Sequence, residues 1–165
     1  MPTMEEYAKQ PREQRMARLT RTAGELAAAI TGQSEAVLSR RPDAKNWAAK
    51  EVVCHLRDTE EAFGVRFEQI LAMDTDPKLG GPGNPDRWAE ERQYMRNDAA
   101  EALAAFRKRR EETLATFSKL TPAQWGKGGI HPVRGRMTID TFLTLMAWHD
   151  DNHLDQLARA LEGRA

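Results

Sequence analysis

Apolar residues recur at spacings of three and four along four long stretches of this chain, with polar residues between them. This period matches one face of an α-helix, because a helix completes a turn about every 3.6 residues. In the last stretch, for example, Ile139, Phe142 and Met146 follow the pattern. No alternating strand pattern of useful length competes with it. The pattern predicts four helices, at about Glu13–Thr31, Trp47–Met73, Met95–Leu120 and from after Thr138 to Glu162.

Cap residues mark the ends of these predicted helices. We expect Asn46 to cap the second helix and Thr138 to cap the fourth, because their side-chain oxygens can accept from free N–H groups of the first turn. Thr121 and Pro122 are typical of the cap and first position of one further turn, which should end at Trp125.

Two connections are rich in glycine and proline. The stretch DTDPKLGGPGNPDRW follows the second helix, and its three prolines and three glycines exclude a helix there. A connection as long as residues 74–93 is often functional, for example as a lid, and is otherwise a crossover between helix ends. The sequence leaves both open. The stretch GKGGIHPVRGR is predicted to be a loop or a small hairpin.

Four amphipathic helices indicate an all-α fold, an antiparallel four-helix bundle with long connecting loops. The chain has 165 residues, which is enough for one compact core and too few for two ordinary ones. We therefore expect residues 1–165 to form a single domain.

Composition narrows the possible partners of the protein and its expected cellular compartment. The 25 basic and 25 acidic residues cancel, so nothing indicates nucleic acid or an anionic membrane as partner. The basic run Arg107–Arg110 adjoins two glutamates and is interpreted as a solvated, salt-bridged helix face. The single cysteine, Cys54, excludes an intrachain disulfide and fits a reducing cytoplasm. The first residues, MPTMEEYAKQ, lack the apolar run of a secretory signal, and no stretch approaches the roughly 20 apolar residues of a membrane span.

Two histidines, His149 and His153, fall on the apolar stripe of the fourth helix. Residues four apart lie about 40° apart around a helix and about 6 Å apart along it. Two imidazoles in this relation can converge on one metal ion, as in many zinc sites. Two ligands alone make a weak site, and His55, on the flank of the second helix's stripe, is the natural third. Imidazoles facing a core need polar partners, and a shared metal satisfies one nitrogen of each ring.

Each of these assignments has an alternative. Three inward histidines can be hydrogen-bonded core residues instead of ligands. Metal-bound imidazoles usually donate their other N–H to a carboxylate or carbonyl, and Asp58, Asp150 and Glu51 are near enough to accept, although each by itself is better explained as surface charge.

Other residues whose side chains could bind a metal or take part in catalysis are expected to have structural roles. His131 precedes a proline in a loop and is interpreted as a surface residue, not a fourth ligand. Cys54 is interpreted as a packed core residue. HDDNH places Asp150 where the HExxH of zinc proteases has its base, but aspartate is a methylene shorter and little chain follows to supply a further ligand. The four tryptophans, Trp47, Trp88, Trp125 and Trp148, are expected to anchor helix ends. Two of them, Trp88 and Trp148, could also wall a pocket.

Three parts of the chain together resemble the DinB-like superfamily, which includes the bacillithiol and mycothiol S-transferases and mycothiol-dependent maleylpyruvate isomerase. They are NWAAKEVVCHLRDTE, the long loop after it, and GRMTIDTFLTLMAWHDDNHLDQL with its His-Asp-x-x-His-Leu pattern. The resemblance covers most of the chain and implies a four-helix bundle, a divalent metal on His55, His149 and His153, and often a homodimer. The chain departs from the family where Ala48 replaces the usual serine or threonine, which affects the helix cap and not the metal site.

A three-histidine site leaves a position open for water or substrate, and its uncharged ligands preserve the Lewis acidity of the cation. We therefore expect a transferase that activates a low-molecular-weight thiol and adds it to an electrophilic small-molecule substrate. A metal-dependent hydrolase and a non-catalytic metal- or ligand-binding protein remain alternatives. Zinc, nickel, iron and manganese all accept imidazole and water, so the metal stays open, and no acid–base residue stands out as catalytic.

Overall fold

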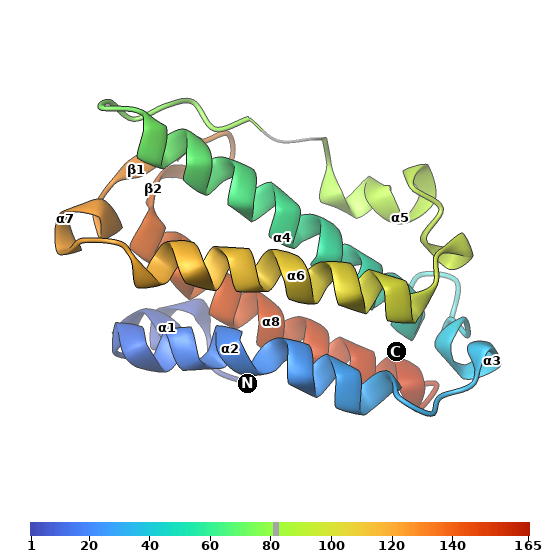
Figure 1. Ribbon diagram of the computed structural model, residues 1–165. Coiled ribbons are helices and arrows are strands. Elements are labelled where there is room, and N and C mark those ends of the chain that lie inside the picture. Colours follow the sequence, from blue (N-terminus) through green and yellow to red (C-terminus); the bar gives the residue numbers. More distant parts are fainter. Residues whose placement is uncertain (81–82) are drawn as a thin grey trace.

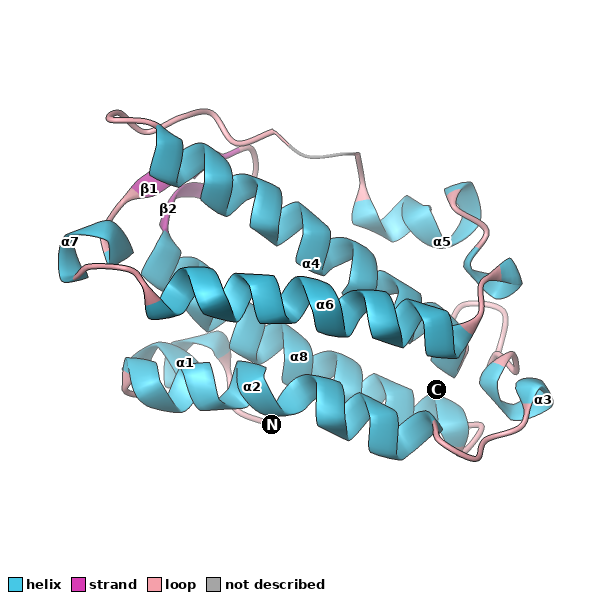
Figure 2. Cartoon of the chain, in the orientation of Figure 1, coloured by secondary structure: helices cyan, strands magenta, loops and turns pink. Residues whose placement is uncertain are grey.

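The computed structural model describes residues 1–80 and 83–165. Within this part of the chain, four long helices carry most of the structure, and short helices and one hairpin connect them (Figures 1 and 2). The elements are α1 (Met4–Lys9), α2 (Arg12–Ile30), α3 (Glu35–Leu38), α4 (Ala49–Ala72), the 3₁₀ turn η1 (Pro85–Arg87), α5 (Trp88–Glu91), the 3₁₀ turn η2 (Tyr94–Arg96), α6 (Ala99–Ser118), α7 (Pro122–Trp125), β1 (Gly128–His131), β2 (Gly135–Thr138) and α8 (Ile139–Leu161).

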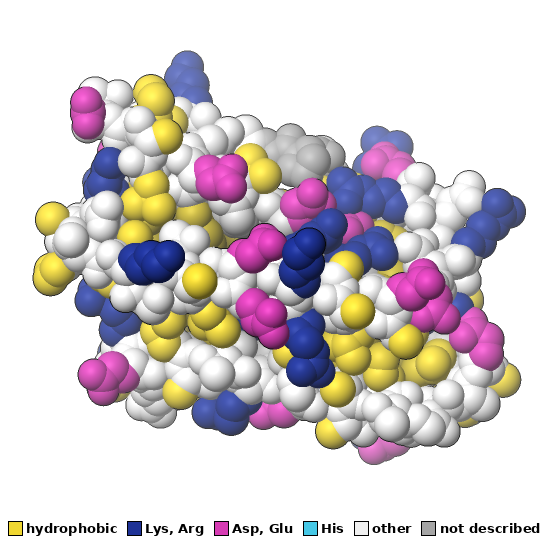
Figure 3. Space-filling view, viewed as in Figure 1, with side chains coloured by type: hydrophobic (Ala, Val, Ile, Leu, Met, Phe, Trp, Pro, Cys, Tyr) yellow, Lys and Arg dark blue, Asp and Glu magenta, His cyan; other side chains and the backbone are white. Residues whose placement is uncertain are grey.

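The four predicted helices correspond to α2, α4, α6 and α8, which pack lengthwise as a bundle (Figure 1). Helices α4 and α2 each pack against both α6 and α8. Their buried faces form two clusters, one around Leu26, Val52 and Phe106 and the other around Phe67 and Phe142. On the face shown in Figure 3, positively and negatively charged side chains are intermixed between small apolar areas.

The predicted antiparallel arrangement is not confirmed, because two neighbouring pairs are antiparallel and the other two are parallel. Contacts of α4 with α8 run in opposite chain directions, since Phe63 and Phe67 of α4 lie against Phe142 whereas the earlier His55 meets the later His149. Helices α2 and α6 are also antiparallel. Arg110 donates to the backbone oxygen of Leu19, whereas the later Ile30 lines one pocket with the earlier Leu103.

The parallel pairs are α4 with α6 and α2 with α8. In the first, Glu60 bonds to Arg110 and the later Phe67 packs on the later Phe117. In the second, Arg15 bonds to Thr144 and Thr22 to Asp150, again in increasing order. Both pairs therefore run in one direction.

The long connection between α4 and α6 makes the parallel pair possible. Helix α4 has 24 residues, about 36 Å at roughly 1.5 Å per residue. Residues 73–98 can cover that length, because an extended chain advances about 3.3 Å per residue. Figure 1 shows the described parts of this segment, residues 73–80 and 83–98, lying along the bundle between the end of α4 and the start of α6. The described parts of this segment have the course of a crossover between helix ends, and a role as a lid stays a prediction.

Most predicted local features are confirmed. Thr138 caps α8 by accepting from Thr141 N, Thr121 caps α7, and the glycine-rich stretch forms the antiparallel β1–β2 hairpin. Asn46 does not cap α4; its amide donates to Asp43. The cap position is Ala48, which has no side-chain acceptor, and its own N–H donates to the carboxylate of Glu51 at 3.1 Å. Helix α1, which begins with a capping box at Thr3, was not predicted.

Helix α6 starts later than its predicted beginning near Met95, because Asp98 accepts from Glu101 N and fixes the first turn at Ala99. Among the described residues, no helix is long and apolar enough to cross a membrane.

Candidate metal centre

His55, His149 and His153 come together between α4 and α8. The Nε2 atom of His149 lies 3.3 Å from Nε2 of His55 and 3.1 Å from Nε2 of His153. Candidate ligand nitrogens of all three rings lie within 4.8 Å of one another. The predicted clustering of these three residues is therefore present in the structure.

The helix geometry produces this convergence. His149 and His153 are four residues apart, so both project from one side of α8. Helix α4 packs against that side and brings His55 from across the interface. Phe63 of α4 packs edge-on against His149 at 5.9 Å between ring centres, and Trp47 lies 4.9 Å from His55. These aromatic contacts restrict how the imidazoles can turn.

The donor set fits a divalent metal. Two nitrogens about 2.1 Å from one tetrahedral ion lie about 3.4 Å apart, close to the observed 3.1 and 3.3 Å spacings. The Nδ1 atom of His153 lies 2.8 Å from Oε1 of Gln156. An amide oxygen only accepts, so Nδ1 of His153 donates and the lone pair of its Nε2 faces the cluster.

The electrostatics keep the three rings neutral. Burial, and then the neighbouring His153, lowers the pKa of His55 to about 3. Burial is also the largest cause that lowers the pKa of His149, followed by the two other histidines. Burial lowers the pKa of His153 as well. Neutral imidazole is the form that binds metal, so no proton has to leave these rings at neutral pH.

The three carboxylates considered as acceptors for the imidazoles are buried, and the expectation of surface charge was wrong for each of them. None of them bonds to a histidine of the cluster within the described residues. Glu51 pairs with Arg41 at 2.6 Å. Asp58 accepts from the hydroxyl of Tyr94 at 2.7 Å. The acceptor that the sequence analysis missed is Gln156, three residues after His153 and on the same side of α8.

The third carboxylate, Asp150, is held away from the histidines. Arg110 donates to it at 2.7 Å and Thr22 at 2.5 Å. Asp150 therefore has no free carboxylate for the general base of a zinc protease, and the geometry excludes that reading of HDDNH. Arg110 also pairs with Glu60 and is buried, so the interpretation of residues 107–110 as a solvated face was wrong at this position.

The histidine cluster forms part of the wall of a pocket of about 720 Å³. This volume suits a small organic molecule. Trp88 and Trp148, the two tryptophans expected to wall a pocket, line it, and Trp47 joins them. Trp125 lies elsewhere, against Phe117. The crossover and the hairpin complete the walls through Gly83–Asp86 and His131–Arg134.

His131 and Cys54 are not part of the cluster. His131 lines the pocket but lies outside the group of three candidate ligands, as expected. Cys54 is fully buried, and burial is the main cause that raises the pKa of its thiol to about 11. A neutral buried thiol is a poor nucleophile, which agrees with the expected packing role.

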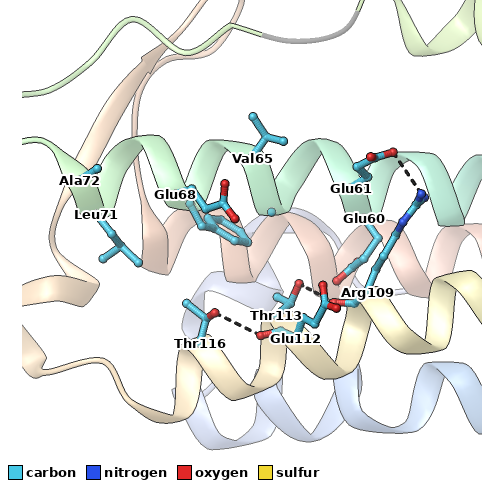
Figure 4. A pocket seen from close by; sticks show the side chains of 12 residues that line it. Glu60, Glu61, Val65, Glu68, Leu71, Ala72, Arg109, Glu112, Thr113 and Thr116 are labelled. Atoms are coloured by element: carbon cyan, nitrogen blue, oxygen red, sulfur yellow. Dashed lines mark hydrogen bonds and ion pairs between the residues drawn. The ribbon is translucent and has the colours of Figure 1, made fainter.

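A second groove follows the outer side of α4 and α6 (Figure 4). It is lined by Glu61, Glu68 and Glu112, and Arg109 pairs with Glu61 at 3.3 Å. At about 100° per residue, Glu61 and Glu68 lie about 120° and 140° around α4 from His55, so the groove is on another side of this helix. No histidine lines this groove, so we place the candidate site in the pocket of the histidine cluster.

The fold and site together define a helical bundle with three convergent histidines in a pocket wall. The chain belongs to the DinB superfamily, whose family model matches residues 18–157. The resemblance inferred from the sequence is therefore confirmed. A solved structure of similar fold is YfiT from Bacillus subtilis, described as a probable metal-dependent hydrolase with an unusual four-helix bundle topology. The two chains are 22% identical with a TM-score of 0.85, covering 95% of this chain and 90% of YfiT. Among curated proteins, none matches this chain.

Proposed function

We propose that this protein is an enzyme that holds a divalent metal on His55, His149 and His153 and adds a low-molecular-weight thiol to an electrophilic substrate. The observation that supports the proposal is the convergence of three neutral Nε2 atoms on the wall of a pocket of molecular size. When bound there, a divalent cation would lower the pKa of an incoming thiol and favour its thiolate. Zinc, nickel, iron and manganese are all candidates.

The residues of the chain have distinct roles in this proposal. Gln156 fixes the tautomer of His153. Arg110 and Thr22 donate hydrogen bonds to the carboxylate of Asp150 and so hold in place the turn of α8 that carries His149 and His153. Trp47 stacks near His153, with 6.4 Å between ring centres, and lines the same pocket. The thiol sulfur is the nucleophile, and its proton would leave to water once the cation has lowered the thiol pKa, so the proposal requires no basic side chain of the protein beside the histidines.

The second candidate is a metal-dependent hydrolase, in which water replaces the thiol as the nucleophile. The similarity to YfiT supports this alternative, because YfiT is described as a probable hydrolase of this kind. The two candidates differ in one requirement, since a hydrolase turns over its substrate without a thiol.

We also propose a homodimer of two such chains, which light scattering of the purified protein would test.

Metal content tests the site directly. The protein would be purified without a polyhistidine tag and its metals measured by plasma mass spectrometry, beside His149→Ala/His153→Ala and the control His131→Ala. We expect about one metal per chain in the parent and in the control, and loss of the metal in the double variant. A parent that contains no metal, and takes up none from zinc, nickel, manganese or anaerobic ferrous iron, would refute the proposal.

Activity then separates the two candidates. The loaded protein would be incubated with electrophiles and esters, each with and without low-molecular-weight thiols. Turnover that requires the thiol supports the transferase. Turnover of esters without any thiol supports the hydrolase, and a fully loaded protein without either activity would indicate a binding protein.

A further inference from the structure

Arg66 of α4 lines the pocket without a counter-charge. Its Nε atom is buried and has no hydrogen-bond partner, and no carboxylate of the described residues forms an ion pair with it. Burial lowers the pKa of this guanidinium. A buried cationic donor without an acceptor is costly, and most such groups in proteins have a partner. This arrangement is typical of a site that is completed by a ligand.

Two residues of the β1–β2 hairpin extend this positive region. His131 and Arg134 line the same pocket as Arg66. The Nδ1 atom of His131 accepts from the backbone N–H groups of Val133 and Arg134, both at 3.1 Å. The proton of the neutral ring is therefore on Nε2, which is left as a donor. Burial, then Arg66 and Arg134, lowers the pKa of His131.

A third unpartnered donor lies in the pocket wall formed by the crossover. Trp88 is 1% exposed, and its indole Nε1 has no acceptor among residues 1–80 and 83–165. The charged groups of the described lining, apart from the histidine cluster, are Arg66, Arg134 and the exposed Asp86 of η1. The pocket therefore combines an excess of donors with a net positive charge, which favours an anion over a neutral or cationic molecule.

We propose that Arg66, His131 and Arg134 form a subsite for an oxyanion, a carboxylate or a phosphate, on the molecule whose reacting group lies at the histidine cluster. Guanidinium groups bind both kinds of oxyanion through paired N–H donors. The assignment of the reacting group rests on the proposed function; the anion subsite itself does not.

Calorimetric titration of the zinc-loaded protein tests the subsite. The first probes are alkyl carboxylates and alkyl phosphonates, each compared with the alkyl alcohol of equal length. The second are ω-mercapto carboxylates of increasing length, each with its ω-mercapto alcohol. The protein variants are Arg66→Met, Arg66→Lys, Arg134→Met and the control Arg107→Met, which changes an exposed arginine of α6 outside this pocket.

We expect the parent to bind the anionic probes about tenfold or more tightly than the alcohols, the effect of one charged hydrogen-bonded pair. Arg66→Met should abolish this preference, Arg66→Lys should keep part of it, and Arg107→Met should keep all of it. If Arg66→Met does not fold by circular dichroism, Arg134→Met, at an exposed position, carries the same test with a smaller loss. The ratio of carboxylate to phosphonate affinity decides which oxyanion is preferred.

Anion binding that is unchanged in both Arg66→Met and Arg134→Met would overturn the subsite, because the anion would then bind only at the metal. The mercapto probes report separately on the proposed function. Anion binding that depends on Arg66, without any gain from a thiol, would support the subsite and count against the thiol transferase.

Discussion

Replacing Arg110 with methionine removes the charge that links all four long helices. The Arg110 side chain is 3% exposed and donates five hydrogen bonds: two to Glu60, two to Asp150 and one to the backbone oxygen of Leu19. These partners lie on α4, α8 and α2. Burial by itself lowers the pKa of Arg110, but the carboxylates of Asp150 and Glu60 outweigh it and raise the pKa, so the guanidinium stays charged.

The expected loss of stability follows from the two buried carboxylates that the substitution leaves without a partner. Methionine is similar in length and fills much of the same space, so the cavity cost is small. The carboxylates of Glu60 and Asp150 are each only 1% exposed, and Arg110 is the one cation that pairs with them in the part of the chain that the structure describes. Removing one partner of a buried ion pair typically costs about 3–5 kcal/mol. We expect Arg110→Met to lower the free energy of unfolding by that amount, a large part of the stability of an average domain.

Urea unfolding followed by circular dichroism measures this loss, beside Arg107→Met as the control. The exposed Arg107 has no ion pair within the described residues, so its replacement should change the free energy by less than about 0.5 kcal/mol. The triple variant Arg110→Met/Glu60→Gln/Asp150→Asn should recover part of the loss, because no charge is then left unpaired. An Arg110→Met protein within about 1 kcal/mol of the parent would refute this reasoning.

Three further predictions concern acid stability, thiol reactivity and the hairpin. Burial raises the pKa of Asp58, but hydrogen bonds from Arg57, Tyr94 and Arg92 outweigh it and lower the pKa. The contribution of ionised Asp58 to the free energy of unfolding is therefore complete above the unfolded pKa of about 3.9 and is lost as the pH falls below that value. Acid titration should show a shallower decline for Asp58→Asn than for the parent, and equal slopes would contradict the assignment. The thiol of Cys54, with its pKa raised to about 11 by burial, should not react with a disulfide reagent at pH 8 until the protein unfolds, and rapid labelling of the native protein would show that it is accessible. Gly128→Ala places a Cβ 2.8 Å from the backbone oxygen of Met137 and should lower the unfolding free energy by about 1–3 kcal/mol in a thermal melt; an unchanged melting temperature would show that the hairpin can shift.

The helices and the histidine cluster could be predicted because both depend on local periodicity. The spacing of three and four that identified α8 also placed His149 and His153 on one side of it, since one helical period governs both. His55 could be chosen as the third because few histidines exist in the chain and it flanks an apolar stripe. The acceptor Gln156 also lay within reach of this reasoning, at three residues from His153.

The buried ion pairs could not be predicted in the same way. Arg107, Arg109 and Arg110 are nearly consecutive, yet only Arg110 is enclosed. Its partners Glu60 and Asp150 lie 50 and 40 residues away in the chain, so their pairing depends on how three helices are rotated against one another. The same long-range contacts decide that Asp150 faces Arg110 and not the histidine cluster.

By itself the sequence determined the class of the fold, the position of its four long helices, the family and the three histidines, because a helix and its exposed and buried sides are properties of neighbouring residues. Only the tertiary structure decided the direction in which the helices pair. Residues 73–98 are long enough to connect α4 to α6 in either direction, and contacts such as that of Phe67 with Phe117 select the parallel one. The pocket is also a product of tertiary structure, because its walls combine α4, α8, the crossover and the hairpin, which meet only when the chain is folded.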